Sequence, residues 1–422
     1  MSSKQRATNG LKLLLGESDS FSQVQASWRF LNNENVTIDG LFQPIKEQVK
    51  KEIEKHCDSY VLAMSDWSHL DYKKHTSKKE LESKNKKDNG KQLGYDLQTT
   101  IAVSDKSGEP IAPLVHNLKT SKKVYSTYDE NIDIKKTHLE ELASRVNSIK
   151  KELDTDKKIV HIVDRESDSV AFMRELDKNK ALFLLRVKKT STVFYLKEEK
   201  SYKQGELANK LGLGKLVKTI KYQKKQVKIY VNSCEVEVRR DATKTTISKD
   251  GKRKYTKVEG KAVKARFIVE RLVDDENNIV AEWLLITNVL DKKVSAQTLA
   301  TWYYYRWKIE SYFKLLKSSG FNLEEWQQKE PIALFKRLLV VSLSCLMVWK
   351  LANDSSQNAK EIRDFLVLLS GRLIEKGKEF TLPALLAGLE SYLQMMDVML
   401  LFSHEELLDM QKKLVDLLGT DF

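Results

Sequence analysis

The sequence predicts an α/β protein with a mixed β-sheet, helices packed on that sheet, an inserted β region and helical segments at both ends. Two observations support this fold class. Between residues 59 and 189, short apolar runs and amphipathic stretches follow the order strand, strand, strand, helix, strand, helix, strand. From about residue 190, period-two alternation replaces that order, whereas both ends of the chain have helical periodicity.

Composition limits the function classes. The 422 residues suffice for two or three domains, and 41% hydrophobic residues indicate a globular protein. A net charge of +14 and a pI of about 9.3 favour a polyanionic partner, although other basic proteins share this balance. Cys57, Cys234 and Cys345 have no metal-ligand spacing, so we expect neither a zinc site nor disulfides, and a reducing cytoplasm.

No membrane partner is expected. The N-terminal stretch MSSKQRATNGLKLLLGES lacks the apolar core and cleavage site of a signal peptide. The most apolar stretch, Leu338 to Ala352, is too short to span a bilayer and contains serines and a lysine. We therefore expect this stretch to be a buried helix of a soluble protein.

The N-terminal part is predicted to be helical up to about Ser59, because FSQVQASWRFLNN and LFQPIKEQVKKEIEKH carry apolar stripes. The apolar run YVLAMSD then predicts a buried strand that ends at Asp66. The lysine-dense stretch from Lys73 to Gln92 predicts a mobile loop. After it, YDLQTTIAVSDKSGEPIAPLVHNL predicts two strands joined by the turn DKSGEP.

The next segments predict βα units. HLEELASRVNSIKKEL and SVAFMRELDKN are predicted helices, and KKIVHIVD and ALFLLRVKK are predicted strands, the first of which ends at Asp164. The ribonuclease-H-like fold has this order of elements, and its active site needs carboxylates on the first and fourth strands. Here those strands end in Asp66 and Asp164.

A β region follows, with alternation in VKIYVNSCEVEVRR and ARFIVERLV, and it closes with VAEWLLITNV. The predicted organisation has four parts. They are a helical N-terminal region (1–58), a ribonuclease-H-like core (59–189 plus 283–331), an inserted β subdomain (190–282) and a helical C-terminal region (332–422).

A helix is predicted from Tyr303 to Gly320. At about 100° per residue, its polar members fall within an arc of about 60° beside an apolar stripe. The polar row is Tyr303, Arg306, Glu310 and Lys317, and the stripe is Trp302, Ile309, Phe313 and Leu316. The row therefore follows the edge of the buried face, where a cleft would run, although solvated charge rows have the same spacing.

Two strand-end aspartates and a helix glutamate predict a metal site. Three neighbouring carboxylates repel one another, and two Mg²⁺ ions, for which Mn²⁺ can substitute, would remove that repulsion. Such an ion pair activates the attacking oxygen and stabilises the leaving oxygen in phosphoryl transfer. Arg306 would hold a flanking phosphate through a bidentate fork, Lys317 would act as a point charge, and Arg165 would hold an acid or a phosphate.

The row on this helix resembles the Tyr-Arg-Glu-Lys signature of the IS-four family of bacterial insertion-sequence transposases, the Tn-five-like group. IVDRESD around Asp164 and AMSDWSHLDY around Asp66 resemble that family's aspartate motifs. The resemblance covers about residues 20 to 355. It implies a DDE triad of Asp66, Asp164 and Glu310, cut-and-paste transposition, and a place in the bacterial cytoplasm at the nucleoid.

The resemblance also implies DNA contacts. Tyr303, Arg306 and Lys317 are carried over through the signature, and Arg186 and Lys188 lie at basic positions that touch DNA in relatives. Trp283 matches a tryptophan that stacks on a flipped base when relatives cut DNA through a hairpin. A tryptophan in an apolar strand is also typical of a core.

We therefore expect a transposase that takes no small-molecule substrate. It would bind its inverted-repeat ends through the N-terminal region (1–58) and also bind target DNA. It would act as a homodimer that pairs through the C-terminal region (332–422). Two alternatives stay open. One is a ribonuclease-H-like nuclease that cuts without joining, which is not expected to share the four-residue signature. The other is a catalytically silent, truncated relative that acts as a DNA-binding inhibitor.

Overall fold

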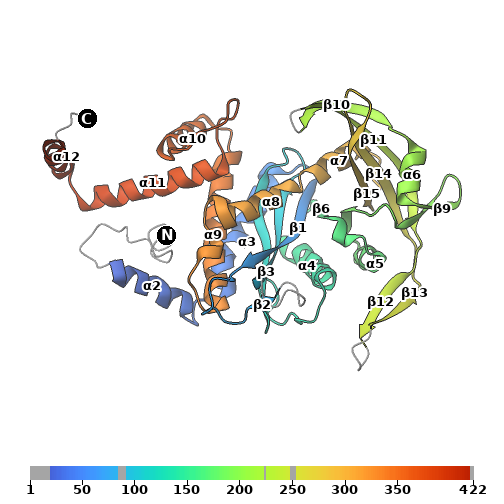
Figure 1. Ribbon diagram of the computed structural model, residues 1–422, viewed down its shortest axis with the longest axis horizontal. Helices are drawn as coiled ribbons and strands as arrows, with labels where there is room; N and C mark the ends of the chain where they lie inside the picture. The colour runs from blue at the N-terminus through green and yellow to red at the C-terminus, as the bar shows by residue number, and fades with distance from the viewer. Residues whose placement is uncertain (1–19, 84–91, 223–224, 248–252, 419–422) are drawn as a thin grey trace. The chain divides into compact units, whose positions relative to one another are not determined.

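The computed structural model describes residues 20–83, 92–222, 225–247 and 253–418. The chain divides into two compact units (Figure 1). Unit 1 comprises Met1–Pro44, His69–Tyr95 and Tyr312–Phe422, and unit 2 comprises Ile45–Ser68 and Asp96–Ser311. Unit 2 contains most of a large mixed sheet with helices, so the predicted α/β class is confirmed at this level.

The first part of the sheet has the predicted strands in the order β5-β4-β3-β1-β6-β7. Their bounds are β1 (Tyr60–Asp71), β3 (Leu93–Ser104), β4 (Pro110–Lys119), β5 (Val124–Ser126), β6 (Lys158–Val163) and β7 (Leu182–Arg186). β3 and β4 form an antiparallel hairpin, whereas β1, β6 and β7 pair in parallel. Helices α4 (His138–Leu153) and α5 (Val170–Lys178) make the predicted connections.

The predicted end of the first strand is wrong. β1 continues to Asp71, so Asp66 lies inside the strand. The parallel ladder with β6 nevertheless ends at the pair Met64 and Ile162, and beyond it β1 still has β3 as a neighbour in the sheet. β6 ends at Val163, one residue before its predicted end, so Asp164 directly follows the strand.

The β region continues the same sheet. β15 (Ile279–Thr287) pairs antiparallel with β7, and Leu285 lies opposite Arg186. The sheet then continues through β14 (Val263–Val273), β11 (Lys225–Val238), β8 (Thr192–Tyr195) and β9 (Lys200–Lys203), and β10 (Lys215–Tyr222) pairs with β11. Helix α6 is Gln204–Leu211, and β12 (Ala242–Ile247) and β13 (Arg253–Val258) form a separate hairpin.

The predicted helix from Tyr303 to Gly320 is not continuous. It consists of α7 (Ala296–Tyr304), α8 (Trp307–Lys314) and a π-helical turn, Leu315–Ser319. At the break, the backbone N–H of Arg306 bonds to the carbonyl of Tyr303, three residues back. The Tyr305 ring packs against Gly108, where an added Cβ would lie 2.3 Å from the ring. Gly108 has φ +70°, so glycine allows both its turn and this contact.

Unit 1 is largely helical, as predicted for the chain after about Ile332. Its helices include α2 (Ser20–Asn32), α9 (Pro331–Asn353), α10 (Gln357–Leu369), α11 (Leu382–Leu401) and α12 (His404–Leu418); α3 (Ile38–His56) belongs partly to each unit, and β2 (Glu82–Ser83) pairs with β3. With 23 residues, α9 is longer than its predicted apolar stretch and long enough to cross a membrane, as is α11. The apolar window of α9 is 72% buried, which confirms a buried helix, whereas that of α11 is 22% buried.

The lysine-dense stretch is only partly a loop. Residues 84–91 lie outside the described residues, but Lys78 is buried in unit 1. Its Nζ donates to the carbonyl of Gln328 at 2.7 Å and lies 4.2 Å from the centre of the Tyr72 ring. The prediction of a mobile loop is therefore wrong at Lys78, because this side chain holds two segments of unit 1 together.

Candidate active site

Two of the predicted acids are joined by one arginine in unit 2. Arg306 Nη1 donates to Asp66 Oδ2 at 3.1 Å, and Nη2 donates to Glu310 Oε1. The Arg306 side chain is 10% exposed, against 20% for Asp66 and 37% for Glu310. We call these three residues the Arg306 cluster. The break before α8 places the arginine at the base of that helix and the glutamate one turn further along.

Asp66 has an unusual electrostatic environment. The pKa of its carboxyl is raised to about 6, mainly by burial and also by the charges of Asp164 and Glu310. The Trp67 backbone N–H, which donates to Oδ1 at 2.8 Å, and the Arg306 guanidinium oppose this shift. Because Asp164 and Glu310 both act on the pKa of Asp66, the three predicted acids lie in one neighbourhood of unit 2.

Asp164 is held by the turn that follows β6. It precedes a short 3-10 helix, Arg165–Ser167, and its Oδ1 accepts the backbone N–H of Glu166 at 2.9 Å. Burial raises the pKa of the Tyr303 hydroxyl, and the charge of Asp164 adds to that shift. Arg165 is exposed.

The carboxylate side chains are suitable ligands for the predicted Mg²⁺, but Arg306 contacts two of them. Carboxylate oxygens are the ligands that Mg²⁺ prefers. Within the described residues, however, no three His, Cys, Asp or Glu side chains are grouped closely enough to hold an ion. The Arg306 guanidinium lies between Asp66 and Glu310 and supplies the positive charge that this part of the site requires. Arg306 contacts one oxygen of each carboxylate, so it would compete with an ion for Asp66 and Glu310.

The other predicted contact residues of unit 2 differ in their surroundings. Tyr303 is buried, and burial raises its pKa to about 12, although the nearby Arg306 and Arg186 guanidinium groups oppose that shift. Its hydroxyl forms no hydrogen bond of normal geometry within the described residues. Arg186 is half-buried at the end of β7, and Lys188 is exposed. Basic groups from β7 and the helix break thus surround a phenol beside the acids.

Lys317 belongs to unit 1. Its Nζ forms an ion pair with Glu324 at 2.9 Å and donates to the carbonyl of His69 at 2.8 Å. The lysine lies on the π-helical turn and is anchored by the 3-10 turn Leu323–Glu325 and by the segment around His69, both within its own unit.

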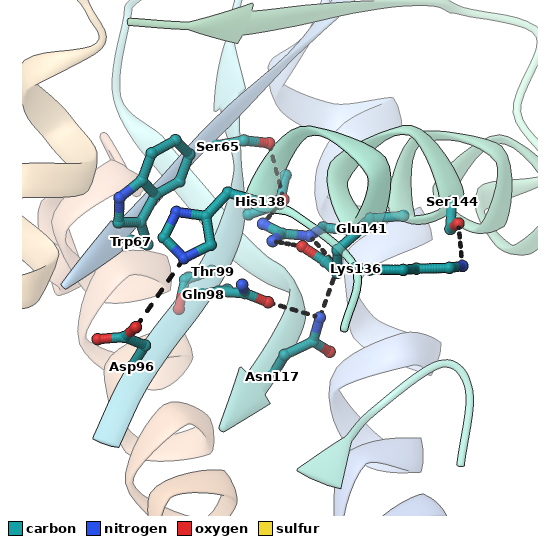
Figure 2. A network of polar contacts seen from close by, with 12 residues as sticks. Ser65, Trp67, Asp96, Gln98, Thr99, Asn117, Lys136, His138, Glu141 and Ser144 are labelled. Atoms are coloured by element: carbon teal, nitrogen blue, oxygen red, sulfur yellow. Dashed lines mark hydrogen bonds and ion pairs between the residues drawn. The ribbon is translucent and has the colours of Figure 1, made fainter. Parts of the chain in front are cut away.

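A second arginine cluster joins α4 to β3, β4 and β1, and Figure 2 labels its members Ser65, Asn117 and Glu141. Arg145 of α4 is 1% exposed and holds both carboxylate oxygens of Glu141, and its Nη1 donates to Thr100 Oγ1 at 3.2 Å. Thr100 Oγ1 in turn lies 2.8 Å from Ser65 Oγ, one residue before Asp66. Asn117 also donates to Glu141, at 2.6 Å. This network, the Arg145 cluster, connects α4 to the strand that carries the first acid.

A cavity of about 400 Å³ lies beside the Arg306 cluster in unit 2. Its floor is one face of β10, β11, β14 and β15, and its wall is α7 with the start of α8. Trp283 and Tyr303 both line this cavity. Trp283, which was predicted to stack on a flipped base, is half-buried there. The cavity also contains a carboxyl, that of Glu270.

Comparison with known proteins identifies the class of this chain. Residues 60–347 match the transposase DDE domain family, and because they make up more than half of the sequence, the chain belongs to that family. Its members are transposases, enzymes that cleave and join DNA with divalent metal ions. No curated protein matches the sequence significantly. A chain in the cryo-EM structure of the piggyBac transposase synaptic complex with hairpin DNA is similar at 9% identity, covering 94% of this chain and 67% of that chain, with a TM-score of 0.37.

Three features were missed in the sequence. The Arg145 cluster has the i, i+4 spacing of an ordinary surface ion pair on a helix, and its burial depends on tertiary contacts. Glu270 did give a signal, because it is a charge within the apolar run ARFIVERLV. Trp307 directly follows Arg306 in the signature and is 53% exposed, which is unusual for a tryptophan.

Proposed function

We propose that this protein is a cut-and-paste DNA transposase of the IS-four family. It hydrolyses one strand at each inverted-repeat end to free a 3′-hydroxyl, excises the element through hairpin ends and joins the 3′ ends to target DNA. One observation carries the proposal: in a chain of the DDE family, Arg306 joins Asp66 and Glu310, and Asp164 acts on the same pKa.

The catalytic core is proposed to be ribonuclease-H-like. The sheet order β4-β3-β1-β6-β7, with parallel pairing among β1, β6 and β7, supports this assignment. In such a core the first acid lies on the central strand and the second follows the neighbouring strand, which agrees with the positions of Asp66 and Asp164.

Asp66, Asp164 and Glu310 are proposed to hold two Mg²⁺ ions. Bound ions would lower the pKa of an attacking water or hydroxyl and stabilise the leaving oxygen. The side chains of the protein have separate roles in this proposal. Arg306 releases one carboxylate and directs its guanidinium group to a DNA phosphate. Arg186, Lys188 and Arg165 add positive charge along the DNA backbone. Lys317 is proposed to contact a flanking phosphate.

Hairpin formation requires sharply bent DNA, and Trp283 is proposed to stack on a base taken out of the helix. Its position in a cavity that also includes Tyr303 supports this role. Two copies of the protein, joined through residues 332–422, are proposed to hold the two ends. The exposed apolar side chains of α11 and α12, such as Met399, Leu400 and Leu417, support such an interface. The protein would act at the nucleoid in the cytoplasm.

The test is excision of the element from a plasmid that carries the flanking DNA of the gene, in Mg²⁺. Asp164→Ala should lower excision by at least about 10³-fold while end-DNA binding persists. Asp156→Ala, at an exposed aspartate on the loop before β6, is the matched control and should excise normally. Excision by Asp164→Ala at the wild-type level would refute the catalytic assignment, and end binding without excision by the wild type would favour a silent inhibitor.

A further inference from the structure

The cavity beside the Arg306 cluster has a defined floor. In the sheet, Glu270 of β14 pairs with Val231 of β11 on one side and with Trp283 of β15 on the other. These three residues form one cross-strand row, and all three line the cavity. The carboxyl and the indole are therefore neighbours on one face of the sheet, about 5 Å apart at their Cβ atoms by sheet geometry.

Glu270 is buried without a partner. It is 9% exposed, and no hydrogen bond within the described part of the chain contributes to the pKa of its carboxyl. Burial raises this pKa to about 7, and the charge of Lys218 opposes the shift. A buried carboxyl without a hydrogen-bond partner is costly, so its presence in a cavity indicates a ligand that supplies donors.

The remaining wall is suited to a flat ring. Tyr304 and Trp307 are 64% and 53% exposed where α7 ends and α8 begins, and both line the cavity together with Trp283. Three aromatic side chains around one cavity are typical of a site for a planar, π-bonded ligand. The volume of about 400 Å³ is within the range of small-ligand pockets.

Tyr303 connects this cavity to the acids. It lines the cavity, and its hydroxyl is influenced by Arg306, Arg186 and Asp164. A nucleotide whose base enters the cavity would therefore have its phosphate close to two guanidinium groups. Among planar ligands, this geometry favours a base that is still attached to DNA.

We propose that this cavity binds one base taken out of the DNA helix and that the Glu270 carboxylate reads its identity by accepting N–H groups of its Watson–Crick edge. This proposal rests on the proposed function and goes beyond stacking on Trp283, because stacking alone tolerates every base. Guanine satisfies Glu270 best, since its N1–H and its exocyclic amino group present two donors side by side to the two carboxylate oxygens.

The experiment uses the full-length protein and synthetic, fluorescein-labelled DNA hairpins that have the sequence of the inverted repeat flanking the gene. One base beside the hairpin tip is guanine, hypoxanthine, unsubstituted purine or absent. The three purines share a ring system and present two, one and no N–H donors on this edge. Binding is measured by fluorescence anisotropy in Ca²⁺, so that affinity is read without turnover, and each of the first three positions of the end is scanned.

The wild type should bind the guanine hairpin about tenfold more tightly than the purine hairpin, with hypoxanthine between them. Glu270→Gln should reduce that ratio to about twofold or less, because an amide presents a single acceptor oxygen. Glu235→Gln, at an exposed glutamate on β11, is the matched control and should keep the wild-type ratio. Trp283→Ala should instead remove the difference between the purine and abasic hairpins.

Two results would overturn the inference: equal affinity of the wild type for the three purines at all positions, or an unchanged ratio in Glu270→Gln. Cleavage of the same end DNA in Mg²⁺, measured in parallel, separates this failure from that of the proposed function. Cleavage without base discrimination contradicts the role of Glu270 alone, whereas absence of Asp164-dependent cleavage contradicts the proposed function.

Discussion

The Arg145 and Arg306 clusters are both arginine–carboxylate arrangements of unit 2, but their surroundings differ. The Arg145 and Glu141 side chains are 1% and 3% exposed, and Asn117, Tyr128 and Thr100 add hydrogen bonds. In the Arg306 cluster, Asp66 and Glu310 are 20% and 37% exposed, and one arginine serves two acids. The first cluster is closed to water, whereas the second retains carboxylate oxygens that another partner can take.

The difference separates a structural role from a functional one. A closed ion pair fixes the position of α4 against β3 and β1, and any exchange of partners would leave a buried charge. An open cluster keeps its acids close together, yet costs less to rearrange because water reaches it. The closed cluster thus supports the strand on which the open cluster depends, through the contact of Thr100 with Ser65.

The largest effect is expected from opening the closed cluster. Arg145→Met should lower the free energy of unfolding by about 3–5 kcal/mol, because Glu141 would be left buried without its counter-ion. Urea unfolding followed by circular dichroism measures this loss. The double variant Arg145→Met, Glu141→Leu should recover a large part of it, since both charges are then gone; no recovery would contradict the assignment of the loss to an unpaired charge.

An intermediate effect is expected from replacing Glu270, whose buried carboxyl is not paired with an arginine. The pKa of Glu270 is about 7, against its ordinary value of 4.5. Between these values the folded protein keeps a proton that the unfolded chain releases, so wild-type stability falls as pH rises through this window. Glu270→Gln should therefore gain up to about 3 kcal/mol relative to the wild type between pH 4 and pH 8.

Thermal unfolding of both proteins across this pH range tests that prediction. Glu235→Gln serves as the exposed control and should follow the wild type. If the stabilities of the wild type and Glu270→Gln changed with pH in the same way, burial of the Glu270 carboxyl would not affect the free energy of unfolding.

The smallest effect on stability is expected from the open cluster. Arg306→Gln should cost only about 1 kcal/mol, because Asp66 and Glu310 keep contact with water. The same variant should gain more thermal stability from added Mg²⁺ than the wild type does, because the arginine no longer competes for the carboxylates. A loss as large as that of Arg145→Met, or a smaller gain from Mg²⁺, would contradict the distinction between the two clusters.

Much of the core was predictable because local signals agree there. The apolar runs before Asp66 and Asp164 and the amphipathic pattern of α4 each need only period and length to be recognised. The helix and strand boundaries that were predicted wrongly depend on contacts with residues that are distant in the sequence. β1 continues past Asp66 beside β3, and the helix break at Arg306 coincides with the packing of the Tyr305 ring on Gly108, almost two hundred residues away in sequence.

The site was partly predictable for the same reason. Spacing along the chain selected Arg306 and Glu310, but it could not indicate that the arginine would lie between the glutamate and Asp66. The cavity needs four strands and a helix from separate parts of unit 2, so no local pattern contains it. Of its lining residues, Trp283 and Tyr303 were selected from the sequence, whereas Glu270, one of the charges in the run ARFIVERLV, was not.

The contact between Asp66 and Arg306 joins residues 240 positions apart in the chain. At a synthesis rate of roughly 5–20 residues per second, the arginine leaves the ribosome about 12–48 s after the aspartate. During that interval the first acid has no counter-ion, and β7 lacks its neighbour β15. A chain that ends before Arg306 therefore carries two of the three acids but lacks both the arginine and the glutamate that complete the Arg306 cluster.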